Sequence, residues 1–167
     1  MNNDFTFTVK LDRSPTDAQC DALFDAGLDD GNVDDGPLGA SVIVTRAAAN
    51  LDDAILSVVA QIKSVGLQPT GIMNEDLVTL PVIARRTGRT HESVRLLAAG
   101  KRGPGNFPPP LTGALYSWAQ VRNWFATYEG AQPAYGTEED TLAAADLFLR
   151  ANILRPHAGK LTDLITA

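Results

Sequence analysis

Residues 80–100 constrain the fold of this chain more than any other stretch, because two short apolar-patterned segments flank the tripeptide Thr87-Gly88-Arg89. Pro81 suits the first turn of a helix over residues 80–86, and Gly88 supplies the backbone freedom that a tight corner needs. Thr90 is a typical N-cap for a second helix that ends near residues 99–100. The predicted inward-facing residues are Val82, Ile83, Ala84, Val94 and Leu97. The pattern therefore predicts two helices packed across a short turn.

The early part of the second predicted helix carries polar side chains on its outward side: His91, Glu92, Ser93 and Arg95. In a helix-turn-helix these positions meet base edges in the major groove. Arg95 is suited to a bidentate contact with guanine, and His91 and Ser93 suit bases or phosphate. Two interpretations of Glu92 stay open at this point: it accepts a hydrogen bond from a cytosine amino group, or it only caps the helix.

The charge of the chain changes sign around this motif. Residues 77–128 hold seven Arg and Lys against one carboxylate, a net charge of +6, whereas residues 1–76 carry −9 and residues 129–167 carry −3. Screening over about 8 Å at physiological salt lets a phosphate respond mainly to nearby charge. The alternative is a solvated basic face between acidic domains. The candidate DNA-binding residues are Arg85, Arg86, Arg89, Thr90, His91, Glu92, Ser93, Arg95, Lys101 and Arg102.

A stretch rich in proline and glycine follows the second predicted helix and includes Phe107-Pro108-Pro109-Pro110. Proline cannot donate to a central ladder, so the stretch is predicted to form an edge hairpin or wing. Lys101 and Arg102 at its start suit phosphate contacts. Trp118 and Trp124 are expected to pack as core aromatics on a closing helix.

This middle segment resembles the winged helix-turn-helix of the excisionase and AlpA-like regulators, which are related to the MerR DNA-binding head. The matching features are an apolar helix ending at Gly88, a Thr-capped helix over residues 90–97, the Phe-Pro-x-Pro turn at 107–110, and Trp118 opening the next helix. The resemblance covers residues 77–128 and implies regulation or DNA architecture. The insert at residues 102–105 lengthens the wing relative to the family pattern, and the family's small size does not predict the preceding domain.

The first 74 residues alternate predicted strands and helices in the order βαββαβ, which indicates a ferredoxin-like α/β sandwich. The predicted strands cover residues 5–11, 32–33, 40–45 and 67–73, and the helices begin at Thr16 and Asn50. A further helix, capped at Thr137, is expected to run to about residue 154 and to be broken by Pro156, His157 and Gly159. The fold class is therefore α+β, with segments 1–74, 75–129 and 130–167.

Several classes of site and protein are not indicated by the sequence. One cysteine, Cys20, allows no internal disulfide, and the acidic turn near Asp30 fails the EF-hand template. The histidines His91 and His157 have no metal-ligand spacing, and no nucleophile–base set is evident. No apolar run is long enough for a membrane span, and the first residues do not have the pattern of a secretory signal. We therefore expect a cytoplasmic protein that is no enzyme and uses no metal or cofactor.

The leading functional hypothesis is a sequence-specific double-stranded DNA-binding protein, a transcriptional regulator that reads the major groove with residues 90–99 and the backbone with the wing. One small head buries limited surface, so a homodimer is expected, held by the N-terminal sandwich or the C-terminal helix. The alternative is a protein-interaction module, such as an antitoxin-like adaptor, whose acidic N-terminal domain binds a protein partner.

Overall fold

The computed structural model describes residues 2–166 and divides the chain into two compact units, each of mixed α and β structure. One unit combines the chain up to Asn74 with the segment from Thr141 onward, and the other is Glu75–Asp140. The expected C-terminal segment 130–167 is thus shared between the units.

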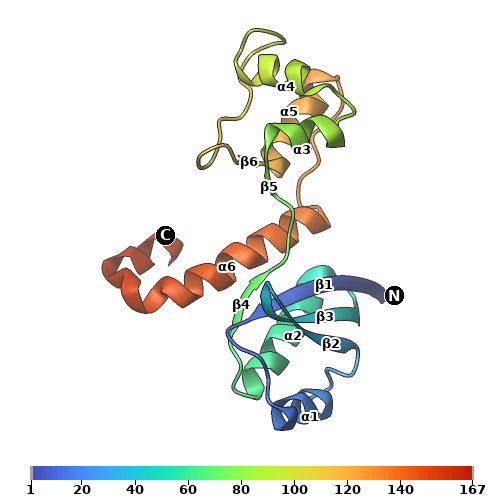
Figure 1. Ribbon diagram of the computed structural model, residues 1–167, viewed down its shortest axis with the longest axis vertical. Coiled ribbons are helices and arrows are strands. Elements are labelled where there is room, and N and C mark those ends of the chain that lie inside the picture. Colours follow the sequence, from blue (N-terminus) through green and yellow to red (C-terminus); the bar gives the residue numbers. More distant parts are fainter. Residues whose placement is uncertain (1, 167) are drawn as a thin grey trace. The chain divides into compact units, whose positions relative to one another are not determined.

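The first unit is built on a four-stranded antiparallel sheet with the strand order β2-β3-β1-β4. Its elements follow the predicted βαββαβ order (Figure 1). They are β1 (Asn3–Leu11), α1 (Asp17–Asp25), β2 (Gly31–Gly36), β3 (Gly39–Ala48), α2 (Leu51–Ser64) and β4 (Pro69–Ile72).

Alternation along β1 and β3 separates a buried face of the sheet from an open one. Val9 pairs with Val42 and Phe7 with Val44, and these side chains pack under α1 and α2 in one apolar cluster. On the open face Thr6 and Thr45 pair, and their hydroxyls are 3.0 Å apart. The sequence pattern thus predicts the core, because successive side chains of a strand point to opposite faces.

Both helices of this unit begin at the predicted caps. The side chain of Thr16 accepts from the backbone N–H of Gln19, and that of Asn50 accepts from Asp53 at 2.8 Å. The spacing of Cys20, Leu23 and Phe24 predicts that all three share one buried face of α1. This is wrong for Phe24, which is 64% exposed, whereas Leu23 alone in α1 is buried. Phe24 lies on the solvent side of this short helix, next to Leu23 in sequence and therefore about 100° around the axis from it.

Arg46 connects three parts of this unit through its guanidinium. It donates to both carboxylate oxygens of Asp30, to Ser57 Oγ at 3.0 Å and to Gln61 Oε1 at 3.0 Å. Its side chain is only 13% exposed. A partly buried arginine is stabilised when its N–H groups have partners, so Arg46 links β3 to the loop before β2 and to α2. The carboxylate cluster of the acidic turn thereby contributes Asp30 to a structural ion pair.

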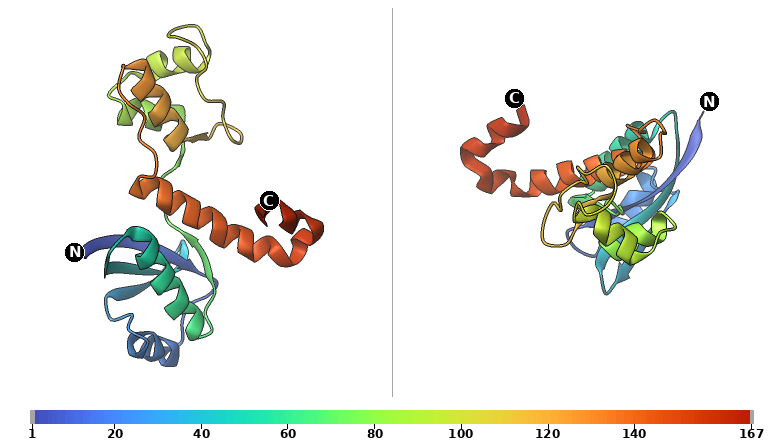
Figure 2. Two further views of the ribbon diagram at one scale, coloured as in Figure 1. Left: turned by 180° about the vertical axis from the view of Figure 1, so that it is seen from behind. Right: turned by 90° about the horizontal axis from the view of Figure 1, so that it is seen from above.

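Helix α6 (Glu138–Ala158) completes the first unit by running beside β4 (Figure 2). Asp146 Oδ1 accepts from the backbone N–H of Ile72 at 3.0 Å, and a Cβ added at Gly71 would lie 2.5 Å from the same oxygen. The carboxylate therefore caps an N–H of the edge strand, which otherwise lacks a ladder partner on that side. The sheet edge and the helix approach closely only because residue 71 is glycine.

The expected break of this helix at Pro156 is wrong, since α6 continues to Ala158. Pro156 lies in the last turn, where it removes one N–H that would donate to the carbonyl oxygen four residues earlier, and the helix ends two residues later. A 3-10 turn (Gly159–Thr162) and the short α7 (Asp163–Thr166) come next.

The second unit contains β5 (Leu77–Val78), α3 (Leu80–Arg86), α4 (His91–Ala98), β6 (Tyr116–Ser117) and α5 (Trp118–Tyr128). Strands β5 and β6 form a two-residue antiparallel pair that the sequence pattern did not predict. Asp76 reinforces it, since its carboxylate accepts from the Ala119 backbone N–H at 2.8 Å and from Ser117 Oγ at 3.1 Å. The start of α5 is thereby fixed to the chain that enters α3.

Within the described residues, no helix combines the length and apolar character needed to cross a bilayer.

Candidate nucleic-acid interface

The corner between α3 and α4 is a closed backbone turn. Gly88 has φ +64°, and the N–H of Arg89 donates to the carbonyl oxygen of Ala84 at 2.9 Å. This is the hydrogen-bond pattern of a Schellman C-cap, which requires a left-handed residue after the helix. Gly88 supplies that conformation, so the predicted turn is confirmed at the predicted position.

The inner faces of the two helices share one apolar cluster with α5. Its members from α3 and α4 are Ile83, Ala84, Val94 and Leu97, and those from α5 are Val121 and Phe125. Val82 is half-buried and packs against the cluster from its edge. Because these side chains are excluded from water, the orientation of α4 about its own axis is determined by packing.

The opposite face of α4 is open to solvent and carries His91, Glu92 and Arg95. With 3.6 residues per turn, positions 91, 92 and 95 lie on one side of the helix, and position 93 does not. Ser93 is half-buried, and its backbone N–H donates to Thr90 Oγ1 at 3.2 Å. The candidate reading face therefore consists of three side chains, with Thr90 as the helix cap behind them.

Glu92 and Arg95 form a bidentate ion pair on this face. Arg95 Nε donates to one carboxylate oxygen at 2.8 Å and Nη2 to the other at 2.7 Å. The hydrogen bonds and charge of Arg95 lower the pKa of Glu92 from its ordinary value of 4.5, and the same hydrogen bonds raise the pKa of Arg95. The carboxylate of Glu92 is thus engaged by Arg95, while the N-cap interaction of α4 comes from Thr90.

Two of the candidate arginines have partners inside their own unit. Arg86 donates to the backbone carbonyl and carboxylate of Glu75 and lies 4.9 Å from the centre of the Trp118 ring. Arg89 donates to Glu129 at 2.9 Å and lies 5.1 Å from the centre of the Phe125 ring. These cation–π and ionic contacts fasten α3 and the turn to α5.

The partners of the arginines change the charge balance expected for this part of the chain. Arg122 donates to Glu139 at 2.8 Å and to Asp140 at 3.1 Å, two carboxylates just beyond residue 128. Glu75–Asp140 as a whole contains seven Arg and Lys and seven Asp and Glu, so the unit has no net charge. The expected basic domain is therefore a unit without net charge, in which the excess of Arg and Lys is confined to residues 77–128.

The remaining candidate cations lie at the end of α3 and shortly after the end of α4. Arg85, Lys101 and Arg102 are exposed, and the described part of the chain offers none of them an ion pair. The N–H of Lys101 donates to the carbonyl oxygen of Leu96 at 2.9 Å, which fixes the direction in which the chain leaves α4. Lys101 therefore starts from a defined backbone position.

The loop after α4 is held by aromatic side chains and forms almost no strand. Trp124 Nε1 donates to the carbonyl oxygen of Gly105 at 3.0 Å, and Phe107 packs edge-on against Trp124 with ring centres 4.9 Å apart. The two tryptophans are half-buried against the cluster, as side chains of a core margin. In place of the expected hairpin, ladder pairing in residues 101–115 is limited to a bridge between Thr112 and Leu115. Three consecutive prolines that cannot donate explain this difference.

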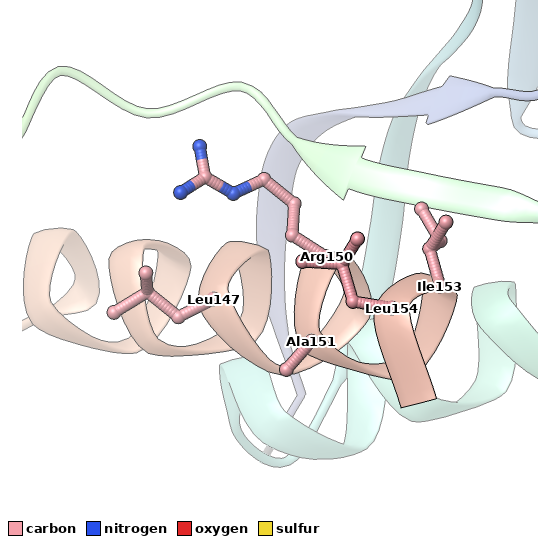
Figure 3. A pocket seen from close by; sticks show the side chains of 5 residues that line it. All are labelled: Leu147, Arg150, Ala151, Ile153 and Leu154. Carbon is pink, nitrogen blue, oxygen red and sulfur yellow. The ribbon is translucent and has the colours of Figure 1, made fainter. Parts of the chain in front are cut away.

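A separate feature lies on the first unit, where α6 has an apolar face without a partner among the described residues. Leu142, Ala145 and Leu149 pack against the sheet core, whereas Leu147 and Leu154 are 59% and 63% exposed. A hollow of about 490 Å³ is lined by Leu147, Arg150, Ala151, Ile153 and Leu154, all from α6 (Figure 3). The helix is therefore apolar on two sides, and a helix of that kind usually has a second partner.

Among the described residues, no three His, Cys, Asp or Glu side chains come together in a way that would hold a metal ion. Comparisons of the chain with protein-family models, with curated proteins and with solved structures found no match.

Proposed function

We propose that this protein is a sequence-specific double-stranded DNA-binding regulator, in which residues 77–128 form a winged helix-turn-helix of the excisionase, AlpA and MerR-related kind. The observation that carries the proposal is the outward face of α4. Its inner residues Val94 and Leu97 are buried, and His91, Glu92 and Arg95 project to solvent from its first two turns. A helix held in this way can enter a major groove with its N-terminal end leading.

The surrounding cations support the same docking mode. Lys101 and Arg102 follow the C-terminal end of α4, and Arg85 is exposed at the end of α3. In the proposal these three side chains contact phosphates on either side of the groove, while Arg95 contacts guanine. Arg86 and Arg89 act indirectly, because their contacts with Trp118, Phe125 and two carboxylates hold the helices in place.

The first unit is proposed to be a ferredoxin-like sandwich that makes the protein a homodimer through α6. The βαββαβ order and the antiparallel arrangement β2-β3-β1-β4 support the fold. The exposed apolar face of α6 supports the dimer contact. Carboxylates lie in the first turn of this helix and a cation in its last turn, namely Glu138 against Arg155. An antiparallel second copy would bring opposite charges together.

Selection of duplexes from a random pool, at a stated salt concentration, tests the function. We expect enrichment of a site with two related half-sites, and retention of the enriched duplex in the presence of excess scrambled duplex. A wild-type protein that retains no duplex at low salt would refute the proposal, because phosphate contacts are strongest there.

A protein partner remains the second candidate for the first unit. Its exposed carboxylates include Asp17 and Asp21 of α1, Asp29 of the turn before β2 and Asp34 of β2. A stoichiometric complex with one protein, together with no retention of duplex, would favour an adaptor over a regulator.

A further inference from the structure

We infer that Glu92 is a positioning residue that holds Arg95 for a guanine contact, and that it neither caps α4 nor reads a base. This inference rests on the proposed DNA-binding function and assigns a role within the same surface. The geometry that carries it is the bidentate pair between Arg95 Nε and Nη2 and the two oxygens of Glu92, at 2.8 and 2.7 Å.

The N–H groups of Arg95 that Glu92 accepts from determine which N–H groups are left to donate to a base. Glu92 takes the Nε–H and one N–H of Nη2, so the N–H groups of Nη1 and the second N–H of Nη2 remain at the outer end of the fork. Guanine presents O6 and N7 in the major groove, which suit two parallel donors of this kind. Within the described residues, no other hydrogen bond of Arg95 competes for that outer end.

Orientation matters here because Arg95 is exposed and has many rotamers. Its side chain is 49% exposed, and burial restricts it little. Fixing such a side chain costs conformational entropy, and a carboxylate that fixes it before binding lowers that cost. Glu92 lies one helical turn earlier on the same face, so it reaches Arg95 without any change in the backbone.

Positioning of Arg95 favours DNA binding, whereas the negative charge of Glu92 by itself opposes it. A carboxylate on the reading face repels phosphate, and its removal alone would tighten binding to every duplex. Positioning predicts a different result, because loss of Glu92 would weaken the selected site and leave scrambled DNA unaffected or bound more tightly. The ratio of the two affinities therefore separates positioning from simple repulsion.

The test compares wild-type protein with Glu92→Gln, Arg95→Ala and the double variant, on the duplex selected by the wild type and on a scrambled duplex of equal length. Glu92→Gln should lose about tenfold on the selected duplex. The double variant should bind it no worse than Arg95→Ala, because both changes remove the same contact. Asp25→Asn, which removes an exposed carboxylate at the end of α1 in the first unit, is the charge-matched control and should leave the ratio unchanged.

The inference is wrong if Glu92→Gln binds the selected and the scrambled duplex more tightly by the same factor. It is also wrong if Glu92→Gln keeps the preference for guanine and changes the preferred base at a cytosine position of the site, because Glu92 would then read that cytosine. A measurement without DNA makes the two failures distinguishable. In the free protein the ¹⁵N signal of Arg95 Nε should shift when Glu92 becomes Gln. An unchanged signal refutes the positioning even if the duplex binds, whereas no duplex binding by the wild type refutes the proposed function itself.

Discussion

The indole N–H of Trp124 donates to the backbone carbonyl of Gly105 at 3.0 Å, so a side chain of α5 holds the middle of the loop that carries Lys101 and Arg102. Trp124 also stacks on Tyr128, with ring centres 5.2 Å apart, and meets Phe107 edge-on. The loop has little ladder pairing of its own. Its conformation therefore depends on this aromatic contact more than on backbone hydrogen bonds.

Trp124→Phe should remove the hydrogen bond and keep part of the ring packing. We expect a loss of about 0.5–1.5 kcal/mol in the free energy of unfolding of this unit. Amide exchange in residues 101–107 should become faster. Chemical denaturation and hydrogen exchange measure the two effects. Tyr128→Phe keeps the stacked ring and is the matched control, in which loop exchange should stay at the wild-type rate.

Gly71→Ala should separate α6 from the edge of the sheet. A Cβ there would lie 2.5 Å from Asp146 Oδ1, which accepts from the N–H of Ile72. We expect a destabilisation of about 1–3 kcal/mol, measured by chemical denaturation.

Gly36→Ala is the control for that substitution, since its Cβ would meet Asp34 at an ordinary 3.6 Å. The double variant Gly71→Ala, Asp146→Ala should be no less stable than Asp146→Ala alone, because the two residues share one contact. Simple addition of the two losses would contradict the proposed clash.

Local patterns predicted most of the elements, because caps and alternation depend on neighbouring residues. Thr16, Asn50 and Thr90 cap helices where the sequence placed them, and the βαββαβ order follows from the spacing of apolar residues. Gly88 marks the turn for the same reason, since a positive φ at the end of a helix favours glycine.

The distribution of charge could not be predicted in this way, because ion pairs depend on residues distant in sequence. Arg89 pairs with Glu129, and Arg122 pairs with Glu139 and Asp140, so a count over residues 77–128 overstates the positive surface. The strand pair β5–β6 joins residues about forty positions apart and has only two residues per strand. Such short strands carry too few positions to show alternation.

The pH dependence of Asp140 follows from its position at the start of α6. Burial works to raise its pKa, but the hydrogen bonds from Thr137 and the charge of Arg122 outweigh burial and lower the pKa from its ordinary 3.8. A lowered folded-state pKa contributes stability that is present above the unfolded value and is lost as pH falls through the folded value.

The stability of the wild type should therefore fall more steeply below pH 3.8 than that of Asp140→Asn. The ¹³C shift of the Asp140 carboxylate, followed by NMR, should titrate below its ordinary value. Arg122→Met should move that titration upward. A carboxylate that titrates at the ordinary value in the wild type would show that the contacts with Thr137 and Arg122 do not persist in solution.

Lys101→Ala should weaken binding to selected and scrambled duplexes by similar factors, because a phosphate contact carries no sequence information. The slope of log affinity against log salt should decrease by about 0.9 for each phosphate that the protein no longer neutralises.

Arg95→Ala should instead reduce the preference for the selected duplex. Lys63→Ala removes the same charge from α2 in the first unit and should change neither quantity. Equal losses on both duplexes for Arg95→Ala would contradict its role in reading a base.

Leu154→Glu should convert the protein from a dimer to a monomer, because Leu154 is 63% exposed on the apolar face of α6 that no described residue covers. Burying a carboxylate in an apolar contact is unfavourable, so the second copy should be released. Light scattering across a concentration series measures the change. Leu56→Glu is the matched control, since Leu56 is 66% exposed on α2 and lies outside this face.

A wild-type protein that is monomeric at every concentration would refute the α6 contact. A Leu154→Glu variant that stays dimeric would move the contact to another surface. If the contact is right, the variant should also lose affinity for a duplex with two half-sites and keep its weaker affinity for a single one, because the dimer supplies the second reading helix.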